Sequence, residues 1–238
     1  MRLTVLGCYG PFPAKGKACS GYLIESHGQS LLLDCGSGVV SNLRRFTEPE
    51  ELCGIVLSHL HFDHVGDMGV MRYALEVNNA RLPVLAPRSP EAVHEIFLEC
   101  GSFFVSDAIS DKDFRFGPFT VRMYPAVHPV ETYSVRISDG ETSLFYTGDT
   151  GIHNALIDYA DNADTILADT CFWNSREGKS NAHMTVPEAV SVTQACGAQR
   201  LICSHLFGGI PVEKPELTAE LSGLRYIEVA EQLKTYEI

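Results

Sequence analysis

The stretch His59-Leu60-His61-Phe62-Asp63-His64 places four potential metal ligands within six residues. The apolar residues 55–57 precede it and predict a buried strand that delivers these ligands at its C-terminal end. Residues 65–75 have the apolar spacing of a helix that starts just after the ligands. Because imidazoles and carboxylates both bind zinc, three histidines and one aspartate in so tight a turn can serve two ions rather than one.

Length and composition predict one compact domain spanning residues 1–238, because 45% of the residues are hydrophobic and can bury a full core. The start of the chain lacks the basic region and long apolar run of a signal peptide, and no apolar run reaches the roughly 18 residues of a membrane helix. These features predict a cytoplasmic protein with no membrane partner.

The eight cysteines include no Cys-x-x-Cys pair of the kind found in zinc ribbons and redox couples. Cys35, Cys171 and Cys203 lie in apolar, strand-like runs, where a thiol is usually a small core residue. We therefore expect reduced and mostly buried cysteines rather than a disulfide framework.

The formal net charge of −12 disfavours non-specific binding to nucleic acid, which depends on Lys and Arg side chains that neutralise phosphates. It does not exclude a phosphate-containing substrate, because bound divalent ions make a pocket locally positive. The charge of the whole chain therefore leaves the substrate of a metal site open.

Short apolar runs separated by Gly, Pro and Asp predict strands in both halves of the chain. In the first half, strands are expected at residues 3–8, 22–25, 30–34 and 83–86, and helices up to about residue 46 and at 89–99. In the second half, strands are expected at 119–126, 132–138, 142–146, 165–169 and 201–203, and a helix at 186–196. Strand-rich halves with their own helices indicate an α/β fold with two packed sheets and helices outside.

Further metal ligands would have to come from later strand ends, and three polar residues follow apolar runs directly. His128 follows residues 124–127, Asp149 follows residues 144–148, and His205 follows residues 201–204. One such residue alone is usually a turn or capping residue. Several of them beside the 59–64 cluster indicate that both halves of the chain build one site.

Taken together, these residues resemble the metallo-β-lactamase-fold hydrolases, and the resemblance spans nearly the whole chain. It implies a four-layer αββα sandwich of two mixed β-sheets flanked by helices. It also implies two divalent ions, with Zn²⁺ as the expected metal and Mn²⁺ or Fe²⁺ as alternatives. One ion would be held by His59, His61 and His128, the other by Asp63, His64 and His205, and Asp149 would bridge them.

A closer resemblance is to the ribonuclease Z-like and phosphodiesterase branch, since Ala182-His183-Met184-Thr185 is similar to its Gly-His-Ser-Thr motif ahead of a helix. This implies that His183 is an additional active-site histidine, that Asp169 supports it, and that Asp34 lies behind the metals. Residues 82–128 leave no room for the long arm that holds transfer RNA. We therefore expect a member of the branch without that arm, and transfer RNA is not an expected partner.

The resemblance implies a dizinc hydrolase in which a metal-bridging hydroxide attacks a small or single-stranded phosphodiester, such as a cyclic nucleotide. Asp63 and His183 are expected to take part in catalysis, with His183 stabilising phosphoryl charge or protonating the leaving oxygen. Two alternatives stay open: a hydrolase of a lactone, thioester, β-lactam or other ester, and a metal-bearing binding or sensing protein without turnover. The family often pairs subunits, so a homodimer is also expected from the resemblance.

Other residues are assigned from their position in the sequence. The loop 10–21 is expected at the rim of the site, and Phe12, Phe172 and Trp173 either line its substrate side or belong to the core, since aromatic residues at strand ends are equally often core residues. The remaining histidines are expected to have no role in the site, and His94 is placed on a surface helix: His27, His94 and His153. No Gly-x-Ser-x-Gly elbow or phosphate-binding loop competes with the metal cluster.

Overall fold

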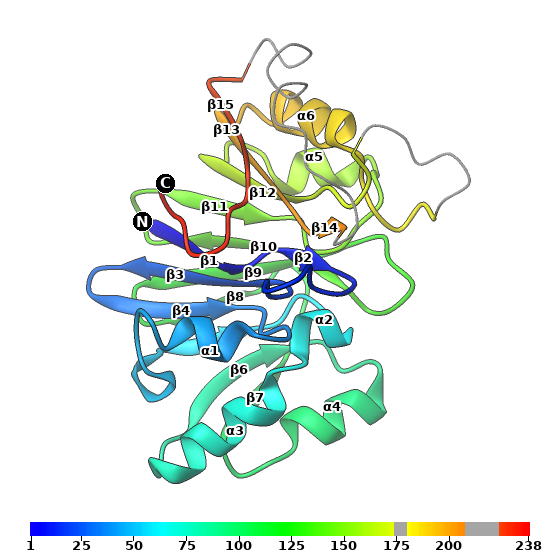
Figure 1. Ribbon diagram of the computed structural model, residues 1–238. Helices are drawn as coiled ribbons and strands as arrows, with labels where there is room; N and C mark the ends of the chain where they lie inside the picture. The colour runs from blue at the N-terminus through cyan, green and yellow to red at the C-terminus, as the bar shows by residue number, and fades with distance from the viewer. Residues whose placement is uncertain (174–179, 208–223) are drawn as a thin grey trace.

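The computed structural model describes residues 1–173, 180–207 and 224–238, and two mixed sheets form its centre (Figure 1). The first sheet has the order β16 (Thr235–Glu237), β1 (Arg2–Gly7), β3 (Gly21–Ser26), β4 (Gln29–Leu33), β5 (Gly54–Val56), β6 (Leu82–Ala86) and β7 (Phe103–Asp107). The second has the order β15 (Tyr226–Val229), β13 (Arg200–Ser204), β12 (Thr165–Asp169), β11 (Ser143–Tyr146), β10 (Tyr133–Ser138), β9 (Phe119–Pro125) and β8 (Asp113–Phe116). A short parallel pair joins β2 (Tyr9–Gly10) to β14 (Leu206–Phe207).

Helices cover the outer face of each sheet (Figure 1). On the first sheet lie α1 (Val39–Leu43), the 3₁₀ turn η1 (Pro49–Glu51), α2 (Phe62–Val65), α3 (Met68–Val77) and α4 (Glu91–Leu98). On the second sheet lie α5 (Ala155–Tyr159) and α6 (Val186–Ala195). The layers are those of the predicted αββα sandwich. No helix in the described ranges is long and apolar enough to cross a membrane.

Each sheet is mixed because hairpins build one part of it and crossovers build the other. In the first sheet, β1, β3 and β4 pair antiparallel, while β4 to β7 pair parallel. In the second, β8 to β11 form an antiparallel meander, while β11, β12, β13 and β15 pair parallel. The hairpin predicted from Asp139-Gly140 joins β10 to β11, and Gly140 takes a φ of 93°, which glycine tolerates best.

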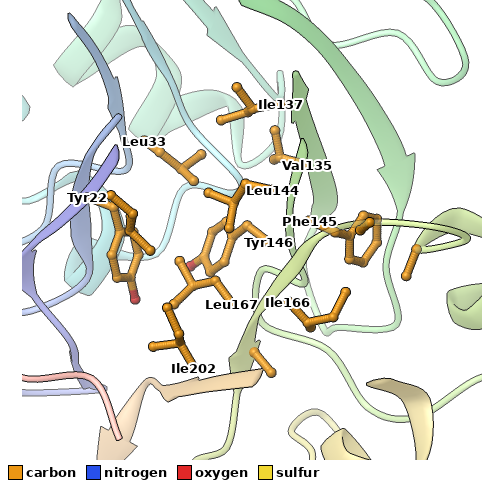
Figure 2. Close-up of a cluster of buried hydrophobic side chains, with 14 of the residues drawn as sticks. Tyr22, Leu33, Val135, Ile137, Leu144, Phe145, Tyr146, Ile166, Leu167 and Ile202 are labelled. Atoms are coloured by element: carbon orange, nitrogen blue, oxygen red, sulfur yellow. The ribbon is translucent and has the colours of Figure 1, made fainter. Parts of the chain in front are cut away.

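The main core lies between the sheets, and strand alternation explains how both faces of the first sheet are buried. Successive side chains of a strand point to opposite faces. In β4, Leu31 and Leu33 belong to the core between the sheets, whereas Leu32 packs into a second core with the residues of α1 and α3. Figure 2 shows the first core, where Tyr22 and Leu33 of one sheet face Tyr146 and Leu167 of the other.

The structure corrects several local expectations. The helix expected at residues 65–75 is two helices, and the first of them, α2, begins inside the ligand stretch at Phe62. Helix α4 begins at Glu91, one residue after its N-cap residue Pro90, and His94 on it is buried rather than exposed. The apolar pattern missed several short elements of the described residues. Four of them are edge strands of the two large sheets, β7, β8, β15 and β16, and the others are β2, η1, α5 and β14.

Candidate metal centre

The predicted metal ligands and Asp34 follow the C-terminal ends of strands, and the two sheets bring these ends together. Asp169 is the last residue of β12, and His183 lies just before α6. Asp34 follows β4, the 59–64 stretch follows β5, and His128 follows β9. Asp149 and His205 follow β11 and β13 of the second sheet. Carboxyl ends of parallel strands are where ligands bind in open α/β sheets. The site therefore lies at one edge of the sandwich, with contributions from both halves of the chain.

The local backbone at this edge is held in unusual conformations. Asp34 and His205 have φ angles of 58° and 53°, in the left-handed region that side chains other than glycine seldom adopt. Helix α2 approaches the β4–α1 loop so closely that a Cβ at Gly36 would lie 2.0 Å from the carbonyl oxygen of Asp63. Backbone strain of this kind concentrates at functional sites, where the surrounding structure maintains it.

The first group of potential ligands contains His59, His61, His128 and Asp149, whose ligand atoms lie within 4.8 Å of one another. The distance from His61 Nδ1 is 3.0 Å to His59 Nε2 and 3.1 Å to His128 Nε2. Ligands placed tetrahedrally about 2.0–2.1 Å from a zinc ion are about 3.3–3.4 Å apart. These two separations are therefore already close to those that a single bound ion requires.

The second group contains Asp63, His64, Asp149 and His205, again with ligand atoms within 4.8 Å. His205 Nε2 lies 3.2 Å from Asp63 Oδ2 and 3.0 Å from Asp149 Oδ2, and His64 Nε2 lies 3.3 Å from Asp149 Oδ1. Asp149 belongs to both groups. Asp149 is therefore the residue that would contact a metal ion held by either group.

Hydrogen bonding and burial show that these donors fit metal ions. Within the described part of the chain, the buried atoms His64 Nε2 and Asp149 Oδ1 have no hydrogen-bond partner. Such atoms are costly unless something else satisfies them. Burial lowers the pKa of His59 well below its usual value and also lowers the pKa of His61 and His128, so these rings are neutral, which is the form that binds metal.

The carboxylates of the site remain ionised although they are buried. Burial alone would raise the pKa of Asp149, but His205, His64 and His59 more than offset this and hold it well below its usual value. The pKa of Asp63 is also lowered, since His64 and His205 outweigh its burial. The same carboxylates raise the pKa of His64 and of His205, so these two rings would have to release a proton to bind a metal. Mixed imidazole and carboxylate donors of this kind suit zinc, manganese or iron.

Behind the second group, Asp34 accepts four hydrogen bonds and orients His64. Its carboxylate accepts from the backbone N–H and the hydroxyl of Ser58, at 2.7 and 2.8 Å. It also accepts from His64 Nδ1 at 2.8 Å and from the Tyr146 hydroxyl at 2.9 Å. Since Nδ1 of His64 donates to Asp34, its Nε2 edge is the one that faces the site and that would bind a metal. Ser58 and Tyr146 were not predicted as parts of this network.

An Asp34→Ala variant should lose about 10–100-fold in metal affinity, because a carboxylate behind a metal-binding histidine fixes its tautomer and raises its basicity. Titration of the metal-free protein with zinc against a chromophoric chelator measures this. Asp164→Ala is a matched control, since Asp164 also accepts hydrogen bonds, from Ser143, but lies outside the site. Unchanged zinc affinity in Asp34→Ala would contradict the idea that Asp34 orients His64 for metal binding.

His183 lies next to both groups and is held by Asp169, as the resemblance implied. Its Nδ1 is 2.8 Å from Asp169 Oδ2, and its ring stacks on that of His205 with 5.1 Å between centroids. Asp169 also accepts from the backbone N–H groups of Thr150 and Cys171. Burial alone would lower the pKa of His183, but Asp169 outweighs burial and raises it.

The other predicted residues are divided between the site and the core. Of the three aromatic residues, Phe12 is exposed. Phe172 is buried against the ring of His183, at a near-perpendicular angle, and Trp173 packs against the core. Phe12 is therefore the one of the three that a substrate could contact freely.

Cys171 is buried as expected, but its sulfur also lies within 4.8 Å of ligand atoms of His183 and His205, which the apolar pattern could not reveal. All eight cysteines are free. His27, His94 and His153 lie outside the potential metal groups found among the described residues.

The αββα sandwich and the His/Asp groups at its strand ends define a metallo-hydrolase of the metallo-β-lactamase fold. The family model for the Beta-lactamase superfamily domain matches residues 29–206, and the chain belongs to this family. It is 35% identical over 215 residues to the probable metallo-hydrolase YhfI of Bacillus subtilis, covering 87% of each chain. The crystal structure of YhfI covers 99% of this chain and 98% of its own, with a TM-score of 0.91 and 32% identity.

A ribonuclease Z is a more distant relative. The chain is 26% identical over 226 residues to the mitochondrial ribonuclease Z 2 of Schizosaccharomyces pombe. The match covers 85% of this chain but 33% of that protein. The ribonuclease Z-like resemblance is therefore found in sequence as well, although most of the larger protein has no counterpart in the matched region.

Proposed function

We propose that this protein is a two-metal phosphodiesterase that acts on a small or single-stranded phosphodiester. The proposal depends most on the position of His183. Its Nδ1 is hydrogen-bonded to Asp169, and this bond holds the ring beside both groups of potential metal ligands. When bound, two divalent ions would supply a water of lowered pKa and a positive centre for the substrate's oxygens. His59, His61 and His128 would hold one ion, Asp63, His64 and His205 the other, and Asp149 would contact both.

The charges of the site favour an anionic substrate. Two divalent ions carry four positive charges, and the carboxylates of Asp63 and Asp149 carry two negative ones, so the loaded site has an excess of positive charge before any nucleophile is counted. A phosphodiester anion fits this excess better than an uncharged lactone or thioester does. The negative charge of the whole chain does not oppose this, because the metal-loaded site would be locally positive.

The role proposed for His183 follows from its hydrogen bond. Asp169 accepts from Nδ1, so the Nε2 edge is the one left to meet a substrate. From that position an imidazole can donate a hydrogen bond to a phosphoryl oxygen or a proton to the leaving oxygen. The ribonuclease Z relative supports phosphodiester chemistry, because RNA is a phosphodiester polymer.

A substrate panel tests the proposal with zinc-loaded and manganese-loaded protein. We expect hydrolysis of bis(p-nitrophenyl) phosphate and of at least one cyclic nucleotide, with loss of activity when a chelator removes the metal. Turnover of a lactone, thioester or β-lactam without phosphodiester turnover would replace this proposal with that of an ester or amide hydrolase. Tight binding of a phosphorylated ligand without any product would instead favour a binding or sensing protein.

A further inference from the structure

An aromatic pair of one exposed ring, Phe12, and one half-buried ring, Phe207, lies beside the metal centre and has no role in the proposed chemistry. The short parallel pair of β2 and β14 places Gly10 opposite Phe207 (Figure 1). Gly10 also packs against the predicted ligand His205, since a Cβ there would lie 2.0 Å from His205 Nε2. The chain next to Gly10 is therefore fixed directly at the edge of the site.

Two residues further on, Phe12 contacts the ring of Phe207 edge to face, with 5.5 Å between centroids and an interplanar angle of 72°. This is a favourable geometry for two aromatic rings, so the pair is a preformed surface. Phe12 nevertheless leaves 49% of its side chain exposed. Phe172 and Trp173 differ, because they are packed against His183 and the core.

Resting on the proposed phosphodiesterase function, we propose that Phe12 binds the nucleobase of a nucleotide substrate by stacking. The metal centre takes the phosphate, and Phe12 stands two residues beyond the backbone that touches His205. A planar, largely uncharged base suits an aromatic face, and such stacking is tolerant of base identity. The pair would therefore select nucleotides over other phosphodiesters without selecting strongly among bases.

Binding of product-like ligands tests this independently of turnover. Zinc-loaded protein is titrated calorimetrically with adenosine monophosphate and with ribose 5-phosphate, which carries the same phosphate group without a base. We expect the nucleotide to bind about tenfold more tightly or better, as aromatic stacking of one base implies. In Phe12→Ala this preference should disappear while the affinity for ribose 5-phosphate stays unchanged.

Two further variants separate stacking from a structural role. Phe12→Trp should keep or increase the preference for the nucleotide, since its ring is larger. Phe46→Ala removes a phenylalanine that is similarly exposed (42%) but lies after α1, and it should keep the preference. An equal loss of affinity for adenosine monophosphate and for ribose 5-phosphate in Phe12→Ala would overturn the proposal, because it would show damage to the metal centre instead.

Ligand affinity and phosphodiester hydrolysis together distinguish the role of Phe12 from the proposed function of the metal centre. Equal affinity of the wild-type protein for both ligands, together with hydrolysis of bis(p-nitrophenyl) phosphate, would reject the role of Phe12 alone. Absence of binding and of phosphodiester hydrolysis would reject both.

Discussion

Asp149→Ala is expected to abolish phosphodiester turnover and to leave the protein with less than its full metal content. Asp149 belongs to both groups of potential ligands, and its carboxylate lies 3.0 Å from His205 and 3.3 Å from His64. Its removal would take a proposed ligand from both ions at once, so the loss of metal affinity should exceed the roughly 10–100-fold that follows from removing a group behind a ligand. Metal content by mass spectrometry and turnover measured on the same sample check this.

The control for this variant is again Asp164→Ala, which removes a carboxylate that accepts hydrogen bonds elsewhere in the second sheet. It should keep its metal and its turnover. A thermal melt of both variants shows whether they are folded. Asp149→Ala protein that is folded and still binds two ions would contradict the assignment of Asp149 as the shared ligand.

His183→Ala is expected to keep its metal and to lose about 10²–10⁴-fold in kcat, the range for removal of a general acid or base. The reason is that His183 is held by Asp169 beside the metal groups without being needed to complete either of them. Single-turnover kinetics with bis(p-nitrophenyl) phosphate, on protein of known metal content, measure the loss. A pH–rate profile that loses one limb in the variant would identify proton transfer.

An exposed histidine provides the comparison for His183. His27 lies in the turn before β4 with a φ of 50°, a conformation that asparagine tolerates, so His27→Asn should be active. Turnover in His183→Ala equal to that of His27→Asn would remove the proposed role of His183. Loss of metal together with turnover would instead reassign His183 as a ligand.

The metal ligands from the second half of the chain could be predicted from the sequence, because each of them follows an apolar run. His128, Asp149 and His205 follow β9, β11 and β13, and the carboxyl ends of these strands share one edge of the sheet. The fold class followed from the same runs, combined with a family resemblance. Strand order and pairing could not be predicted, because an apolar run does not identify its neighbour.

The parts that sequence patterns missed depend on contacts between distant segments. Tyr146 donates to Asp34 across the core from the other sheet, 112 positions along the chain. His94 is buried on α4, but it was expected on the surface because the mixed pattern of this helix did not identify the face that packs inward. Cys171 was expected to be a core residue only, and its proximity to His183 and His205 arises from the ends of β12 and β13.

We propose that one site, built by both halves of the chain, hydrolyses phosphodiesters with two metal ions. The most direct test measures turnover of bis(p-nitrophenyl) phosphate against the number of zinc or manganese ions bound per chain, starting from metal-free protein. We predict no turnover without metal and maximal turnover when two ions are bound. Turnover by metal-free protein, or none with two ions bound, would contradict the account.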